Sequence, residues 1–173
     1  MANDFYRQLG TGVSSLTFGV ALSIFIYAAA SGIVSGVQAW LLFATSFLLM
    51  LRFWWRYNEL FVQHAPSRTF WHFLFDFAVA FFGILAVLVV NNIQTWALLG
   101  MLAMISSAVR CLLSRGVSKD VKQKLRRTLC GAVGMLVVLT AVYVLAHAIV
   151  SLNLSAAVFV VVLAFVIYSS RKS

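Results

Sequence analysis

Apolar residues run along this chain in long stretches, and short polar segments separate them. Six stretches lie at 14–34, 38–57, 69–90, 96–114, 128–150 and 153–170. Each has about 18 residues or more, which is close to the length that an α-helix needs to cross a bilayer. The pattern predicts an all-α, polytopic integral membrane protein with six transmembrane helices, in which residues 1–173 form a single membrane domain.

The segments between these stretches alternate in charge. Residues 35–37, 91–95 and 151–152 hold no charged side chain. The other connections, the helix ends beside them and the two chain ends hold all 13 Lys and Arg residues. Because basic residues collect on the cytoplasmic side of membrane proteins, we expect three hairpins with short outer turns and both termini in the cytoplasm. The expected location is the prokaryotic cytoplasmic (inner) membrane.

Composition supports this class. The chain is 63% hydrophobic and 10% charged, which excludes a water-soluble globule with a charged surface. The formal net charge of +9 is then a topological signal, and no nucleic-acid partner is expected. Indole rings favour the membrane interface, so the topology places Trp40 and Trp96 at the outer rim and Trp54, Trp55 and Trp71 at the inner rim.

Asp76 is the one acidic residue well inside a predicted span. A carboxylate at that depth is costly unless it is paired, protonated or hydrated. Helix rise places Arg52 and Arg110 at a similar depth, so either arginine is a candidate partner. Two interpretations stay open. The carboxylate either locks helix packing through an ion pair or serves as an ion or proton site or gate.

His72 precedes Asp76 by four residues and therefore shares its helix face. The two residues could form a pH-sensing pair, or His72 could bond to a lipid headgroup at the interface. The first predicted helix carries small residues at four-residue spacing, which favour close helix packing in lipid: Ala28, Gly32 and Gly36 on one face, and Ser15, Gly19 and Ser23 on another. The second interpretation of these faces is a narrow pore with Ser15, Thr17 and Ser23 as polar lining.

The segment 115–127 combines apolar residues at helical spacing with many basic ones. It fits an amphipathic helix on anionic headgroups, and it equally fits a plain topogenic loop. The candidate lipid-binding residues are Lys119, Lys122, Lys124, Arg126 and Arg127. Signatures of an enzyme, a metal site or a cofactor site are missing from the sequence, so we expect none of them.

Parts of the chain resemble known families. Ser46-Phe47, Trp54, Leu60-Phe61, Trp71 and Asp76 are similar to the second and third helices of the prokaryotic relatives of transmembrane protein 175. That resemblance implies a six-helix potassium-selective channel. The family's Phe-Ser-Asp motif is missing from the first helix, which has Leu16-Thr17-Phe18, so no pore residue is carried over. Gly83-Ile84-Leu85 and Leu99-Gly100 are similar to six-helix acid-resistance membrane proteins of the HdeD type.

Two functions follow as expectations. The first is a small homo-oligomeric membrane protein that forms a passive pathway for cations or small solutes, because six short helices hardly enclose an aqueous route alone. The second is a non-conducting scaffold, partner subunit or stress and acid-resistance protein, in which the intramembrane charges are structural. Both assign membrane lipids, anionic on the cytoplasmic side, as partners.

Overall fold

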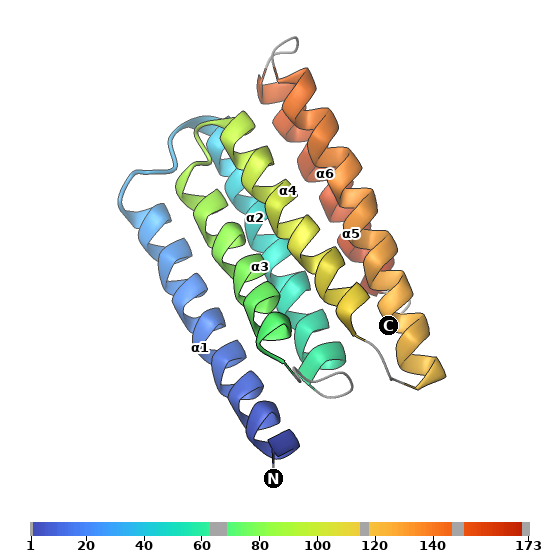
Figure 1. Ribbon diagram of the computed structural model, residues 1–173. Coiled ribbons are helices and arrows are strands. Elements are labelled where there is room, and N and C mark those ends of the chain that lie inside the picture. Colours follow the sequence, from blue (N-terminus) through green and yellow to red (C-terminus); the bar gives the residue numbers. More distant parts are fainter. Residues whose placement is uncertain (1, 63–68, 115–117, 147–150, 171–173) are drawn as a thin grey trace.

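The protein is described by a computed structural model that covers residues 2–62, 69–114, 118–146 and 151–170. The expected all-α class is confirmed (Figure 1). The helices, in chain order, are α1 (Ala2–Ala30), α2 (Gly36–Arg56), η1 (Tyr57–Val62), α3 (Phe70–Leu88), α4 (Ile93–Leu113), α5 (Lys119–Leu145) and α6 (Ser151–Ser170). The element η1 is a π-helical segment that continues directly from α2.

The helices form two layers. In Figure 1, α1, α3, α4 and α5 lie side by side in this order, and α2 and α6 lie behind them. The most extensive contacts join α3 to α4, α4 to α5 and α2 to α6. Of the three expected hairpins, only α3 and α4 pack closely as a pair. A short turn only brings the ends of two successive helices close together. The apolar faces of the helices decide which helices pack along their length, and these faces join α2 to α6.

Helix α1 differs most from the expectation of 14–34. It begins at Ala2 and it ends at Ala30. Gly32 follows with φ +75°, a left-handed conformation that glycine adopts readily after a helix end. Gly36 is the first residue of α2 and also has a positive φ of +78°. Gly32 and Gly36 therefore do not share a helix face with Ala28.

Four helical segments are long and apolar enough to cross a membrane among the described residues. They are Gly36–Phe61, Phe70–Leu88, Ile93–Leu113 and Lys119–Leu145. Shorter apolar stretches occur at Ser15–Ala30 and Leu152–Tyr168. Four helical segments of this length and composition suggest an integral membrane protein.

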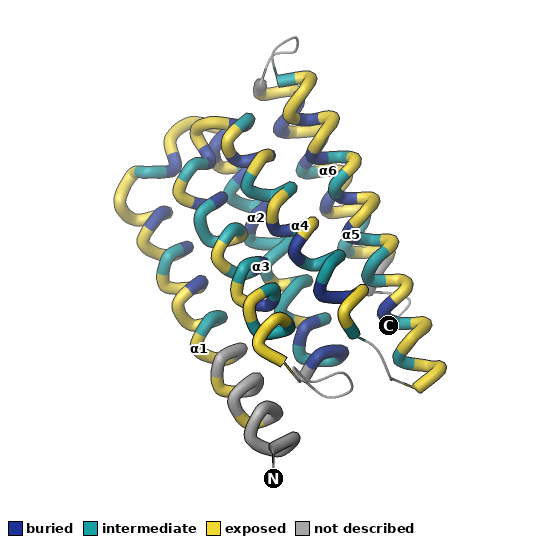
Figure 2. Tube along the Cα trace, in the orientation of Figure 1, coloured by how far each residue is buried: buried dark blue, intermediate teal, exposed yellow. Residues whose placement is uncertain are grey.

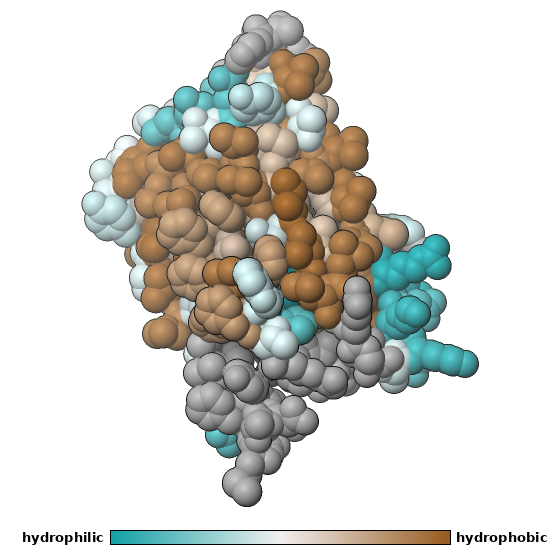
Figure 3. Space-filling view, in the orientation of Figure 1, coloured by the Kyte–Doolittle hydropathy of each residue, from teal (hydrophilic) through white to brown (hydrophobic). Residues whose placement is uncertain are grey.

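The surface of the bundle agrees with a lipid environment. Figure 3 shows hydrophobic residues over the middle of the visible face, with hydrophilic residues at both ends. Many exposed positions along the helices, drawn yellow in Figure 2, carry large apolar side chains such as Leu98, Leu102 and Val137. The main interior cluster includes Leu42, Val87, Trp96 and Leu139, from four different helices.

The basic segment after residue 118 is continuous with α5. No proline or glycine separates Lys119 from Cys130, and these residues favour helix. As part of a single straight helix in Figure 1, the segment follows the direction of the bundle and does not form a separate helix lying flat on a surface. Helix α5 therefore begins nine residues before the start of the apolar span expected at residue 128.

Candidate functional site

A buried ion pair joins α3 to α4. The Nε atom of Arg110 donates to the Oδ1 atom of Asp76 at 2.8 Å. The Arg110 side chain is 1% exposed and the Asp76 side chain 8% exposed. Asp76 therefore has one of its two predicted partners. Arg52, the other candidate, is half-buried on α2 near Arg56 and Glu59.

Three further residues surround this pair. The hydroxyl group of Tyr57 donates to the Oδ2 atom of Asp76 at 3.2 Å. The guanidinium carbon of Arg110 lies 4.3 Å from the centroid of the Phe61 ring, within the range of a cation–π interaction. The Nη1 atom of Arg110 donates to the Oγ atom of Ser114 at 2.5 Å. Both oxygens of the Asp76 carboxylate thus accept a hydrogen bond from the protein, and the Arg110 guanidinium group contacts Asp76, Phe61 and Ser114.

The π-helical segment η1 positions two of these residues. Tyr57 and Phe61 both lie in η1, and both are buried. The sequence predicted that the second helix would end at residue 57, but the helical chain continues through η1 to Val62. π-helical turns are rare and are frequently found at functional sites. Periodicity could not identify this one, because Tyr57, Leu60 and Phe61 fit an ordinary helical turn equally well.

A second group of charges lies on the same segment. Glu59 accepts from the Nη1 atom of Arg56 at 3.0 Å and from the Nζ atom of Lys124 at 2.9 Å. The Lys124 contact ties η1 to the start of α5. Among the predicted lipid-binding residues, Lys124 is therefore partly engaged in an ion pair, whereas the other four are exposed: Lys119, Lys122, Arg126 and Arg127.

His72 connects the beginning of α3 to the end of α4. Its Nε2 atom lies 3.2 Å from the carbonyl oxygen of Leu113, and its Nδ1 atom lies 2.7 Å from the hydroxyl oxygen of Thr69. A carbonyl oxygen can only accept, so Nε2 carries a proton. Both ring nitrogens of His72 have a protein partner, and its expected pH-sensing role stays a prediction.

Of the three polar residues of α1 considered as a pore lining, Thr17 lines the same cavity as Asp76, whereas Ser15 and Ser23 lie elsewhere. Ser15 and Ser23 are exposed, and the Ser23 hydroxyl donates to the backbone carbonyl of Gly19 at 2.9 Å. Ala28 is fully buried in the main apolar cluster. The face with Ser15 and Ser23 is therefore an outer face of the monomer.

Trp96 departs from the expected position at the outer rim. It is 2% exposed, and its indole Nε1 atom donates to the Oγ atom of Ser46 at 2.8 Å. The Ser46 hydroxyl in turn donates to the carbonyl oxygen of Leu42 at 2.9 Å. The sequence shows that an indole favours an interface, but it does not show that a serine on another helix can satisfy the N–H group in the interior.

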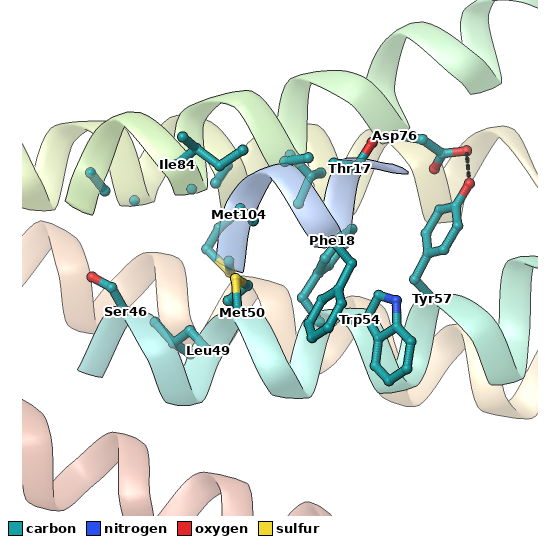
Figure 4. Close-up of a pocket in the computed structure, with 18 of the residues that line it drawn as sticks. Thr17, Phe18, Ser46, Leu49, Met50, Trp54, Tyr57, Asp76, Ile84 and Met104 are labelled. Atoms are coloured by element: carbon teal, nitrogen blue, oxygen red, sulfur yellow. Dashed lines mark hydrogen bonds between the residues drawn. The ribbon is translucent and has the colours of Figure 1, made fainter. Parts of the chain in front are cut away.

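A cavity of about 110 Å³ lies beside the ion pair, between α1, α2, α3 and α4. In Figure 4, α2 forms one wall, α3 and α4 form the opposite side, and α1 crosses between them. Most of its lining is apolar, including Phe18, Leu49, Met50, Ile84 and Met104. Figure 4 also shows Tyr57 and Asp76 joined by their hydrogen bond at one end of the cavity. The sequence analysis did not predict this cavity, because its walls come from apolar positions without a motif.

Comparisons with family models, curated proteins and solved structures find no match to this chain. The two family resemblances therefore stay predictions from the residues alone. The structure defines the class of protein as an all-α bundle with helices suited to an integral membrane protein.

Proposed function

We propose that this protein is a non-conducting scaffold or partner subunit in the membrane, with six membrane crossings and both termini in the cytoplasm. The observation that carries this proposal is the ion pair between Asp76 and Arg110. A side chain that passes ions or protons must release its protein partners in order to bind the passing ion. Here the carboxylate is 8% exposed and accepts from both Arg110 and Tyr57, which favours a structural role.

Helix lengths support six crossings. Helix α6 has 20 residues and α1 has 29, which correspond to about 30 Å and about 44 Å at 1.5 Å per residue. The hydrocarbon core of a bilayer is about 30 Å thick, so both helices are long enough to cross it beside the four apolar spans. The described basic side chains collect at the end of the bundle where α5 begins, which supports a cytoplasmic location of that end.

Cysteine accessibility tests the topology. In a background with both natural cysteines, Cys111 and Cys130, replaced by alanine, single cysteines are introduced in intact cells. A membrane-impermeant maleimide should label cysteines at positions 35, 92 and 151 from outside. Positions 122 and 173 should react only after the membrane is permeabilised. Outside labelling at position 122 would contradict the proposed orientation.

Ion flux tests the absence of conduction. Purified protein in liposomes that contain a potassium-sensitive or pH-sensitive dye should give no more flux than protein-free liposomes, and an added ionophore provides the positive control. The matched variants are Asp76→Asn and Glu59→Gln, which remove a buried and a half-buried carboxylate. Wild-type flux above that of protein-free liposomes would overturn the proposal, and a flux that Asp76→Asn alters and Glu59→Gln leaves unchanged would assign the pathway to Asp76.

The exposed face of α1 favours a second candidate function. Ser15, Gly19 and Ser23 lie on the outer side of the bundle, where small residues allow close approach of another helix. A homo-oligomer in the cytoplasmic membrane, with anionic lipids at the basic residues of α5, could place this face along a cation pathway between protomers. The flux experiment distinguishes this candidate from the scaffold, and Ser23→Leu should then reduce the flux.

A further inference from the structure

One residue that lines the cavity, Trp54, has a buried polar atom without a partner in the described part of the chain. The indole Nε1 atom of Trp54 is buried and has no hydrogen-bond partner among the described residues. Figure 4 shows this nitrogen on the side of the ring that faces α1 and α3, while Phe18 stacks against the indole ring at 4.4 Å between centroids. A buried donor without an acceptor is rare in proteins, because it loses its hydrogen bond to water. It therefore points to an acceptor that a ligand supplies.

The cavity also has an opening on the side of α3. Gly83 and Phe77 both line the cavity and are both exposed, so the cavity meets the surface near them. A Cβ atom built at Gly83 would have no heavy atom within 4 Å. In a membrane protein, an opening in the apolar surface of the bundle faces lipid tails. A ligand can therefore enter from the bilayer.

The size and lining of the cavity restrict what can bind. An apolar cavity of about 150 Å³ stays dry and binds benzene, so a space of about 110 Å³ with an open side suits a short run of methylene groups. Trp54 lies two residues before the end of α2, and exposed Trp55 and Trp71 mark the same end of the bundle as an interface. Ester carbonyl groups of glycerophospholipids lie at this depth, between the headgroups and the tails.

We infer that this cavity is a binding site for one acyl chain of an ester-linked glycerophospholipid. The ester carbonyl oxygen accepts the hydrogen bond from Trp54 Nε1. A short run of the chain's methylene groups then lies in the cavity along α2, on the side of Ser46. It covers apolar side chains such as Phe18, Met50 and Ile84. The site does not depend on whether the protein conducts ions.

Photocrosslinking tests this inference on the full-length protein. Nanodiscs of phosphatidylcholine contain a small fraction of phosphatidylcholine with a diazirine in the acyl chain. One probe is ester-linked, and the other is the ether-linked analogue without the carbonyl group. After irradiation, mass spectrometry of peptides locates the label. The inference requires label at half-buried cavity residues such as Met50 and Met104, in addition to the lipid-exposed Leu98 and Leu102.

Two variants separate a built site from contact with bulk lipid. In the wild type, the ester probe should label the cavity more than the ether probe by about threefold to tenfold, the range expected for one hydrogen bond. Trp54→Phe keeps an aromatic ring beside Phe18 and should remove this preference. Gly83→Phe should reduce cavity labelling by both probes. Labelling at Leu98 should not change in either variant.

Three results would overturn the inference. These are label confined to lipid-exposed residues, equal cavity labelling by the ester and ether probes in the wild type, or an ester preference that Trp54→Phe leaves unchanged. The ester-to-ether ratio is measured within one folded variant, so a modest loss of stability does not change its meaning.

Discussion

Replacing Asp76 by Asn should destabilise the protein strongly. The change leaves the guanidinium group of Arg110 at 1% exposure without its negative partner, although Phe61 and Ser114 still contact it. Breaking a buried pair by removing one partner costs about 3–5 kcal/mol. Asn retains an oxygen that can accept from Arg110, so we expect a value near the lower end, about 3 kcal/mol.

The second substitution distinguishes a buried charge from general damage to the site. Arg110→Met keeps an unbranched apolar chain above the Phe61 ring and removes the charge. In the double variant Asp76→Asn/Arg110→Met, no uncompensated charge remains at the α3–α4 contact. Replacing a buried ion pair by neutral groups is often close to neutral for stability. The double variant should therefore recover at least about 2 kcal/mol of the loss caused by Asp76→Asn.

The measurement is the free energy of unfolding in mixed micelles, from reversible denaturation followed by circular dichroism. Glu59→Gln is the matched control, because Glu59 is also a paired carboxylate but is 21% exposed. Partly exposed pairs contribute about 1 kcal/mol or less. A loss below about 1 kcal/mol for Asp76→Asn, or a double variant as unstable as the sum of the single variants, would refute the reasoning.

Two further predictions concern helix contacts. Trp96→Phe removes the hydrogen bond to Ser46 and should lower the free energy of unfolding by about 1–2 kcal/mol. Ser46→Ala should add little in the Trp96→Phe background, because both substitutions remove the same hydrogen bond. Additive losses of stability would contradict this prediction. Gly100→Leu should cost about 1–3 kcal/mol by overpacking, because a Cβ atom at Gly100 would already lie 3.0 Å from Leu139 Cδ1. The control is Gly134→Leu, because a Cβ atom at Gly134 has no heavy atom within 4 Å, and it should change the free energy of unfolding by no more than about 0.5 kcal/mol. Equal losses of stability for the two variants in thermal unfolding would argue against close α4–α5 packing at Gly100.

The sequence by itself determined the class of this protein and the approximate position of its helices. Long apolar stretches can satisfy their backbone hydrogen bonds in lipid only as helices or closed barrels, and the lengths here are those of helices. The expected third helix at 69–90 and the observed α3 at Phe70–Leu88 agree closely. The importance of Asp76 was also readable, because an isolated acid in an apolar segment needs a partner.

Only the tertiary structure decided which faces and which partners are used. Helix α6 is apolar over most of its length, so its sequence does not reveal the side that packs against α2. Depth alone left Arg52 and Arg110 as equal candidates for Asp76, and the packing of α3 against α4 places Arg110 beside it. The burial of Trp96 depends on Ser46 from another helix. Such contacts are relations between segments far apart in the chain, and hydrophobic periodicity along a single segment carries no information about them.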